Sequence, residues 1–250
     1  MTLPAWCTRT TSVNQIYIFL AFWRFISLDS LLPFLKAMVI VPLTLLPIIN
    51  PLSGAPVFMA TAGGQSNVIP KMAKQVAINC FTVLVVSMLV GTYVLEFFGI
   101  SLPIVRLAGG LLVAATGWRM LNSHDDDDVR NAVAHSHSAP LSEVDIVRRS
   151  FFPITFPLTT GPGSIAAAIA LGAKLPSTPA LYVTGAFVAL LGAAITSLVI
   201  YGVYRHSAAL LARLGEVGTL VMMRLAAFIL LCIGIEIMWT GWTELNHMTH

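Results

Sequence analysis

The sequence predicts an all-α polytopic membrane protein whose six transmembrane helices form two inverted repeats of three helices, with helices 1 and 4 broken. Three observations favour this class. Hydrophobic residues make up 57% of the 250 residues and charged residues only 10%, with a mean hydropathy of +0.84, which excludes an ordinary soluble domain. The apolar residues fall into six long runs, and a proline-interrupted run in the first half recurs in the second half.

Each apolar run is near or above the ~20 residues that cross about 30 Å of hydrocarbon. The expected spans cover approximately residues 35–62, 75–97, 101–121, 151–173, 178–204 and 218–243. We therefore divide the chain into an extension (1–30), a first membrane repeat (31–121), a polar acidic loop (122–150), a second membrane repeat (151–245) and a tail (246–250). The apolar run of the extension, Ile16 to Trp23, is too short for a span and is followed by Arg24 and Asp29, so the extension fits either an interfacial helix or a start codon assigned too early.

Prolines interrupt the first span. A proline inside a helix removes an N–H group and clashes with the carbonyl four residues earlier, so Pro51 frees the carbonyl of Pro47 and Pro56 frees that of Leu52. Within a bilayer such carbonyls must find partners in protein or in trapped water, so a broken apolar helix of this kind is expected to line a polar cavity.

The same pattern recurs 111 residues later, where residues 153–166 align with residues 42–55 without a gap. Pro51 meets Pro162, and Ser53 meets Ser164. Paired interrupted segments in two halves of a chain are the best sequence indication of a transporter's binding site, with half-helix N-termini pointing N–H groups at an anionic part of the solute. The candidate substrate-binding residues are therefore Asn50, Pro51, Ser53, Gly54, Thr159, Thr160, Gly161, Pro162, Gly163 and Ser164.

The third and sixth spans carry matching arginines, Arg106 and Arg224, each about six residues inside its span. This parallel makes each repeat three spans long, and an odd number of spans inverts the second copy. A charge in lipid usually has a function, whereas a long arginine side chain can also snorkel to the interface. Arg106, Arg224 and the later Glu236 are thus either gating or counter-charge residues or structural anchors.

Basic residues are more frequent in loops 1–2, 3–4 and 5–6 than in the opposite loops, which predicts that the first set is cytoplasmic. The loop at 122–150 contains His124, Asp125–Asp128, His135 and His137, but it has no fixed ligand spacing, so we expect a solvated loop and no metal site. Motifs such as HExxH, G-x-S-x-G and the phosphate-binding loop do not occur. We expect neither enzyme activity nor a cofactor, and no basic patch suggests nucleic acid.

The chain also resembles the MarC family (UPF0056) of bacterial inner-membrane proteins over residues ~31–245. The resemblance is carried by Asn50-Pro51-Leu52, by Phe98-Gly-Ile-Ser101-x-Pro103-x-x-Arg106-x-Ala108-Gly-Gly110 with Gly117-x-Arg119-Met-Leu121, by Gly161-Pro-Gly-Ser164-Ile-Ala, and by Gly234-Ile-Glu236 with Thr240-Gly241. It implies a six-span protein of the LysE-like transporter superfamily in the inner membrane, some of whose relatives transport small neutral amino acids. The family begins near residue 30, which supports the assignment of an early start.

Two functions agree with these features. In the first, the protein is a secondary transporter or exporter of a small solute such as a neutral amino acid, driven by the solute gradient or by a coupling ion, a proton or sodium. In the second, it is a non-transporting structural or regulatory membrane protein whose acidic loop is the contact surface. Deleting Asp125–Asp128 separates the two, and the sequence is compatible with a homo-oligomer in either case.

Overall fold

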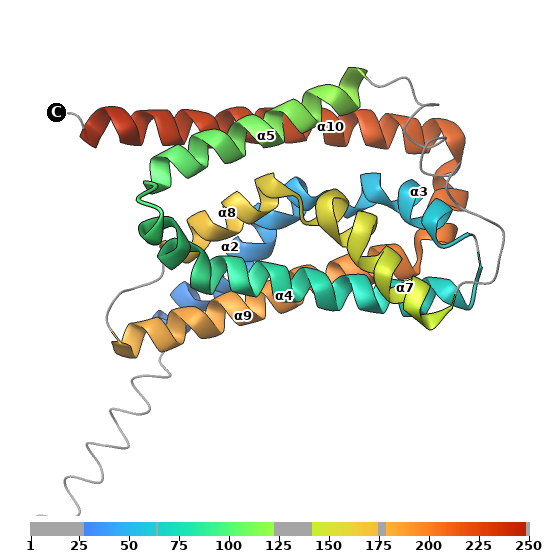
Figure 1. The fold of residues 1–250 in the computed structure, drawn as a ribbon, viewed down its shortest axis with the longest axis horizontal. Coiled ribbons are helices and arrows are strands. Elements are labelled where there is room, and N and C mark those ends of the chain that lie inside the picture. The colour runs from blue at the N-terminus through green and yellow to red at the C-terminus, as the bar shows by residue number, and fades with distance from the viewer. Residues whose placement is uncertain (1–27, 64, 123–141, 175–178, 249–250) are drawn as a thin grey trace, which may run out of the picture.

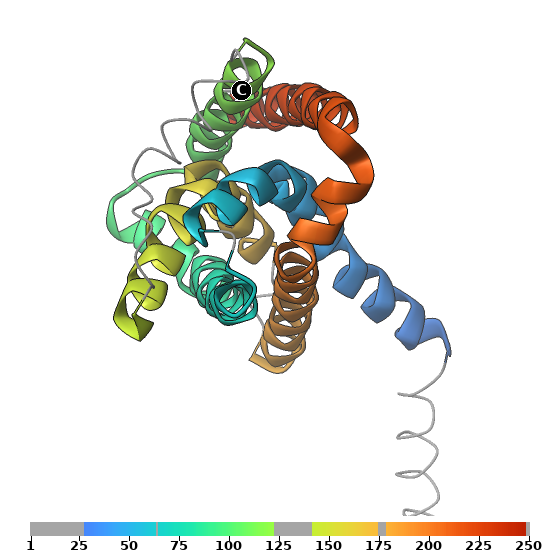
Figure 2. The same ribbon diagram turned by 90° about the vertical axis from the view of Figure 1, so that its right-hand side faces the viewer.

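The computed structural model describes residues 28–63, 65–122, 142–174 and 179–248, and every regular element in these residues is helical. The helices form three layers (Figure 1). One outer layer pairs α5 (Leu102–Asn122) with α10 (Ser207–Met248), and the other pairs α4 (Val68–Phe97) with α9 (Pro179–Arg205). The middle layer holds α2 (Leu28–Ile49), α3 (Pro51–Thr61), η1 (Ser150–Thr159), which follows α7 (Glu143–Arg149), and α8 (Pro162–Gly172). Viewed end-on, α4 and α9 lie on the far side of this layer from α5 and α10 (Figure 2).

Four helices in the described part of the chain are long and apolar enough to cross a membrane: Val68–Phe97, Leu102–Asn122, Gly185–Arg205 and Val217–His247. Two bent pairs pass the same test together, Met38–Ile49 with Pro51–Thr61 and Glu143–Thr159 with Pro162–Gly172. By length and composition, the described residues therefore hold four candidate spans, or six where each bent pair counts as one. The prediction of an all-α membrane protein with broken first and fourth spans is confirmed at this level. The extension up to residue 27 and residues 123–141, with Asp125–Asp128, lie outside the described residues.

The first break lies at Asn50, where the chain turns by 56°. Asn50 has φ 45° and ψ 63°, the left-handed conformation that asparagine adopts more readily than most residues. Pro51 then occupies the first position of α3, where its missing N–H group costs nothing. The other proline, Pro56, lies inside α3 without ending it. The pair Asn50-Pro51 thus ends one half-helix and starts the next.

The second break bends the chain more sharply than the first, by 71° between η1 and α8. In η1, Pro153 and Pro157 prevent regular α-helical hydrogen bonding, and the turns are wide. Threonine hydroxyls replace part of the lost bonding, since each donates to a carbonyl five residues earlier: Thr155 to Ser150 at 2.7 Å, Thr159 to Ile154 at 2.7 Å, and Thr160 to Thr155 at 2.9 Å. The last part of the segment predicted as a polar loop is the short helix α7, capped by Ser142.

Glycines allow α5 and α10 to pack with their backbones in close contact. A Cβ atom at Gly110 would lie 2.6 Å from the backbone nitrogen of Met238, and one at Gly117 would lie 2.6 Å from that of Leu231. A Cβ at Gly234 on α10 would collide with the backbone of Ala114. Small residues at helix–helix contacts are typical of membrane proteins, where dispersion contacts between closely packed helices supply much of the stability.

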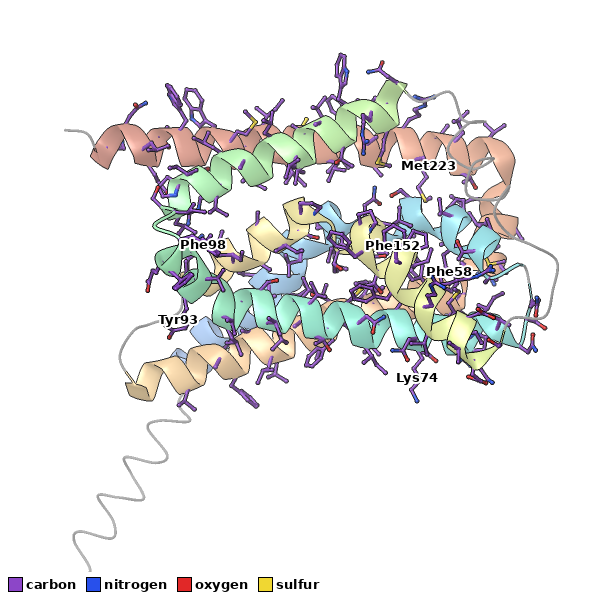
Figure 3. All side chains as sticks on the ribbon, viewed as in Figure 1. Phe58, Lys74, Tyr93, Phe98, Phe152 and Met223 are labelled. Carbon is purple, nitrogen blue, oxygen red and sulfur yellow. The ribbon has the colours of Figure 1, made fainter. Side chains whose placement is uncertain are left out.

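The core lies between the middle layer and the layer of α4 and α9. Among its fully buried side chains are Leu45, Phe58, Leu84 and Tyr204. Large apolar side chains cover the outside, as expected for a surface in contact with lipid. Aromatic side chains gather at the end of α4, where Tyr93 and Phe98 are exposed (Figure 3). Such a cluster is typical of the level at which hydrocarbon gives way to water.

Candidate functional site

A cavity of about 560 Å³ lies where the second break faces the layer of α5 and α10. Six helical elements (α2, α3, α5, η1, α8 and α10) and the α8 N-cap line it. Most of the lining is apolar, with prolines from η1 and aliphatic side chains from the other elements. The lining residues are Ile48, Val57, Leu112, Val113, Thr116, Arg119, Pro153, Pro157, Leu158, Thr159, Gly161, Pro162, Gly163, Ser164 and Leu230.

The cavity contains half of the residues that the sequence analysis singled out as substrate-binding, all from the second break. The start of α8 forms one wall, and its first N–H groups have no partner within the helix. Gly163 packs so closely on α5 that a Cβ atom there would collide with Val113. The predicted cavity-lining residues that the structure brings together are Thr159, Gly161, Pro162, Gly163 and Ser164.

The candidate residues of the first break, Asn50, Pro51, Ser53 and Gly54, are not among those that line this cavity. The hydroxyl of Ser53 donates to the carbonyl of Asn50 at 2.9 Å, as the hydroxyl of Ser164 does to Gly161 at 2.9 Å. The two breaks therefore share one local arrangement, a serine at the third position of the new half-helix bonded to the residue before the proline. The side-chain nitrogen of Asn50 is buried and finds no hydrogen-bond partner among the described residues.

Tyr204, which the sequence analysis did not select, joins the two breaks. Its hydroxyl lies 2.8 Å from the hydroxyl of Thr159, and its ring stacks on Phe58 with centroids 4.6 Å apart. A Cβ atom at Gly54 would lie 2.7 Å from the same Tyr204 hydroxyl. In Figure 3, Phe58 lies on the side of α3 that faces α4, within the core. Tyr204 on α9 therefore contacts α3 and η1 at once.

Thr160 is fully buried, and its hydroxyl donates within η1, so its observed contact supports the backbone of the break. Thr159 is also buried, but it lines the cavity. The hydroxyls of the second break are thus engaged mainly in holding the irregular turns. The groups of the second break that remain available to a ligand in the cavity are the backbone N–H groups at the start of α8.

The two matching arginines, Arg106 and Arg224, lie outside the lining of the cavity, and each joins one end of α5 to α10. Arg106, near the start of α5, forms an ion pair with Glu244, near the end of α10. Arg224 donates to the carbonyls of Met120 and Leu121 at the end of α5. The described contacts of both arginines are those of structural anchors. Glu236 is exposed on α10 and is likewise not a lining residue.

Arg119 is the lining residue with the most distinctive chemistry that the sequence analysis did not select. Leu112, Thr116 and Arg119 recur at spacings of four and three, so they share one face of α5. That periodicity was available in the sequence. A basic residue at the end of a span, however, is the usual sign of an interfacial anchor, and only the packing of α8 on α5, with η1 lining the same space, turns this face into a cavity wall.

Among the residues that the structure describes, no three His, Cys, Asp or Glu side chains gather closely enough to hold a metal ion.

Residues 35–245 match the MarC family of integral membrane proteins. Proteins named UPF0056 inner membrane protein MarC from Escherichia coli O157:H7 and from E. coli K12 / DH10B are each 30% identical over 223 residues, which is 88% of this chain and 100% of each relative. No solved structure matches. A match across nearly all of the membrane-spanning part, together with the apolar helical fold, shows that the chain is an integral inner-membrane protein of the MarC family.

Proposed function

We propose that the protein is a secondary transporter or exporter of a small solute such as a neutral amino acid, and that the cavity at the second break is its binding site. The observation that carries this proposal is the meeting of a broken membrane helix with a cavity of about 560 Å³. Interrupted helices in membranes are tolerated where they are buried in protein or line a cavity, and binding sites of transporters are commonly built this way.

In the proposed complex, the first N–H groups of α8, at Gly163 and Ser164, bind the carboxylate of the solute. The start of a helix favours negative charge because its N–H groups and dipole point outward. Thr159 lines the same space and adds a hydroxyl oxygen. The apolar walls, such as Leu112 and Leu230, contact the body of the solute. Asn50 of the first break does not line the cavity in this conformation, and its buried side-chain nitrogen, which has no partner among the described residues, is proposed to reach the solute when the repeats move.

We further propose that the chain consists of two inverted three-span repeats that rock against each other. The packing supports this because related elements pair with each other, α5 with α10 and α4 with α9. Likewise α8 packs on α4 and α5, while α3 packs on α9 and α10. The matched serine contacts at the two breaks, Ser53 with Asn50 and Ser164 with Gly161, support the same relation. The solute gradient or a proton or sodium gradient would drive the cycle.

The test is transport of labelled small neutral amino acids by the pure protein in liposomes, using a matched pair of variants. Leu112 and Leu111 are neighbours on α5 and both are exposed, but only Leu112 lines the cavity. Leu112→Trp should fill the cavity and abolish transport, whereas Leu111→Trp should leave it near the wild-type rate. Size-exclusion profiles in detergent establish that both variants fold.

Two outcomes would contradict the proposal. If wild-type protein moves none of these solutes faster than empty liposomes do, with or without a proton or sodium gradient, it does not transport this class. If Leu111→Trp and Leu112→Trp reduce transport equally, transport does not use the cavity.

A further inference from the structure

Among the described residues that line it, the cavity carries an unbalanced positive charge. Arg119 is the one charged side chain among its described lining residues, and no carboxylate faces it there. Arg119 is exposed although it lines the cavity, so it stands where the cavity opens to the outside of the bundle. A guanidinium at the mouth of a mostly apolar pocket attracts anions and repels cations, and its effect is larger there than in open water.

The hydroxyl groups of the lining already donate their hydrogens to acceptors within the protein. The hydroxyl of Thr116 donates to the carbonyl of Leu112 at 2.7 Å, and that of Ser164 donates to Gly161 at 2.9 Å. Thr159 donates to Ile154 and also contacts Tyr204. Since these hydrogens already have acceptors, the guanidinium of Arg119 is the main side-chain donor left for a solute.

We propose that the cavity selects solutes that carry a carboxylate on a small apolar body, and that Arg119 is the residue that determines this specificity. This inference rests on the proposed function and names the feature of the solute that the site recognises. Together with the first N–H groups of α8, Arg119 binds the carboxylate through the paired N–H groups of its guanidinium, a geometry that lysine does not reproduce. The apolar lining, with residues such as Val57 and Leu230, accepts the rest of the molecule. The ammonium group of an amino acid is then not required for binding.

Competition experiments in proteoliposomes test this selection. Transport of labelled leucine is measured against two unlabelled analogues: 4-methyl-2-oxopentanoate, which keeps the carboxylate but lacks the ammonium group, and leucinamide, which lacks the carboxylate. The oxo acid should compete about as well as leucine, and the amide should compete at least roughly tenfold more weakly, because it forgoes the charge-assisted hydrogen bonds.

Substitutions of Arg119 test whether this residue determines the selection of carboxylates. Arg119→Gln should weaken competition by the oxo acid at least roughly tenfold, so that acid and amide become similar, and Arg119→Lys should restore it only in part. Arg148→Gln is the matched control, because Arg148 is an exposed arginine on α7 that does not line the cavity. It should behave as wild type.

Each outcome has a defined meaning. If wild-type protein transports leucine but the amide competes as well as the oxo acid, the inference about the carboxylate is wrong and the transport proposal stands. If the selection exists but survives in Arg119→Gln, Arg119 does not determine it. If leucine is not transported, thermal unfolding with each analogue still decides: stabilisation of wild type by the oxo acid alone, lost in Arg119→Gln, supports the inference, and any other pattern overturns it.

Discussion

Tyr204 shows how one side chain fixes the geometry of a broken membrane helix. Its hydroxyl contacts Thr159 of η1, and its ring stacks on Phe58 of α3. A buried phenol needs a hydrogen-bond partner, and the partner here belongs to the irregular segment. Gly54 leaves room for that hydroxyl. The position of the second break relative to the first therefore depends on a pair of residues, Gly54 and Tyr204, that are 150 positions apart in sequence.

We expect Gly54→Ala to destabilise the protein by about 1–3 kcal/mol, the usual cost of overpacking a core. The added methyl group would lie 2.7 Å from the Tyr204 hydroxyl. The ring carbon that bears the hydroxyl is 3.6 Å away, which is an ordinary contact. Gly54→Ala should therefore cost much less in a Tyr204→Phe background than in the wild type. Reversible unfolding in mixed micelles measures the four free energies of this double-mutant cycle.

Tyr204→Phe alone should cost about 1 kcal/mol, because it removes one buried hydrogen bond while Thr159 keeps its bond to Ile154. Tyr201→Phe is the control, since the Tyr201 hydroxyl accepts only from the exposed Arg205 among the described contacts. Additive effects of Gly54→Ala and Tyr204→Phe would mean that the hydroxyl is not the obstacle, and would contradict this account of the contact.

At the scale of elements, α5 and α10 form the most extensive helix pair in the described structure, and glycines determine how closely they approach. Gly234→Ala should destabilise the protein by about 1–3 kcal/mol, because the new methyl group meets the backbone of Ala114, which cannot rotate away. Gly202→Ala on α9 is the matched control. A Cβ atom there has no neighbour within 4 Å, so this change should be neutral or stabilising by up to about 1 kcal/mol.

Thermal unfolding in detergent, with the monodisperse fraction from size exclusion, compares these two glycine variants. If Gly202→Ala is as harmful as Gly234→Ala, the loss reflects glycine itself and not the contact between helices. A loss confined to Gly234→Ala would establish that backbone contact between α5 and α10 stabilises the bundle.

The elements themselves could be predicted from the sequence because their causes are local. The breaks lie where Pro51 follows Asn50 and where Pro162 follows Gly161, so both were predicted from local sequence, although Pro56 lies inside α3 without ending it. The ends of the straight helices were also predicted to within about five residues, apart from the starts of α4 and α10, because apolar length is a local property. The ion-pair partner of Arg106 was not predictable in this way, since Glu244 is 138 positions away. Arg119 was missed for the same reason, because its cavity exists only after α8 packs on α5 and η1 lines the space beside them.

On the scale of the whole molecule, basic side chains gather at one end of the bundle. Lys71 and Lys74 lie near the start of α4, and Arg205 lies at the end of α9. Arg119 lies near the end of α5, at the same side (Figure 1). Lys74 points away from the helices in Figure 3. The opposite end carries the aromatic residues Tyr93 and Phe98, also labelled there. Basic residues favour the cytoplasmic side, so this end is the proposed cytoplasmic face.

Labelling of single cysteines in intact spheroplasts tests this orientation. In a variant whose three native cysteines are replaced by serine, Lys74→Cys should react with a membrane-impermeant maleimide only after the inner membrane is permeabilised. Ile100→Cys, an exposed position in the turn between α4 and α5, should react in the intact spheroplasts. The cysteine-free protein controls for background. Because the basic end also holds Arg119, this result decides from which side a carboxylate would first meet the guanidinium. The reverse labelling pattern would place Arg119 at the periplasmic face and make the proposed site an entry for solutes from outside the cell.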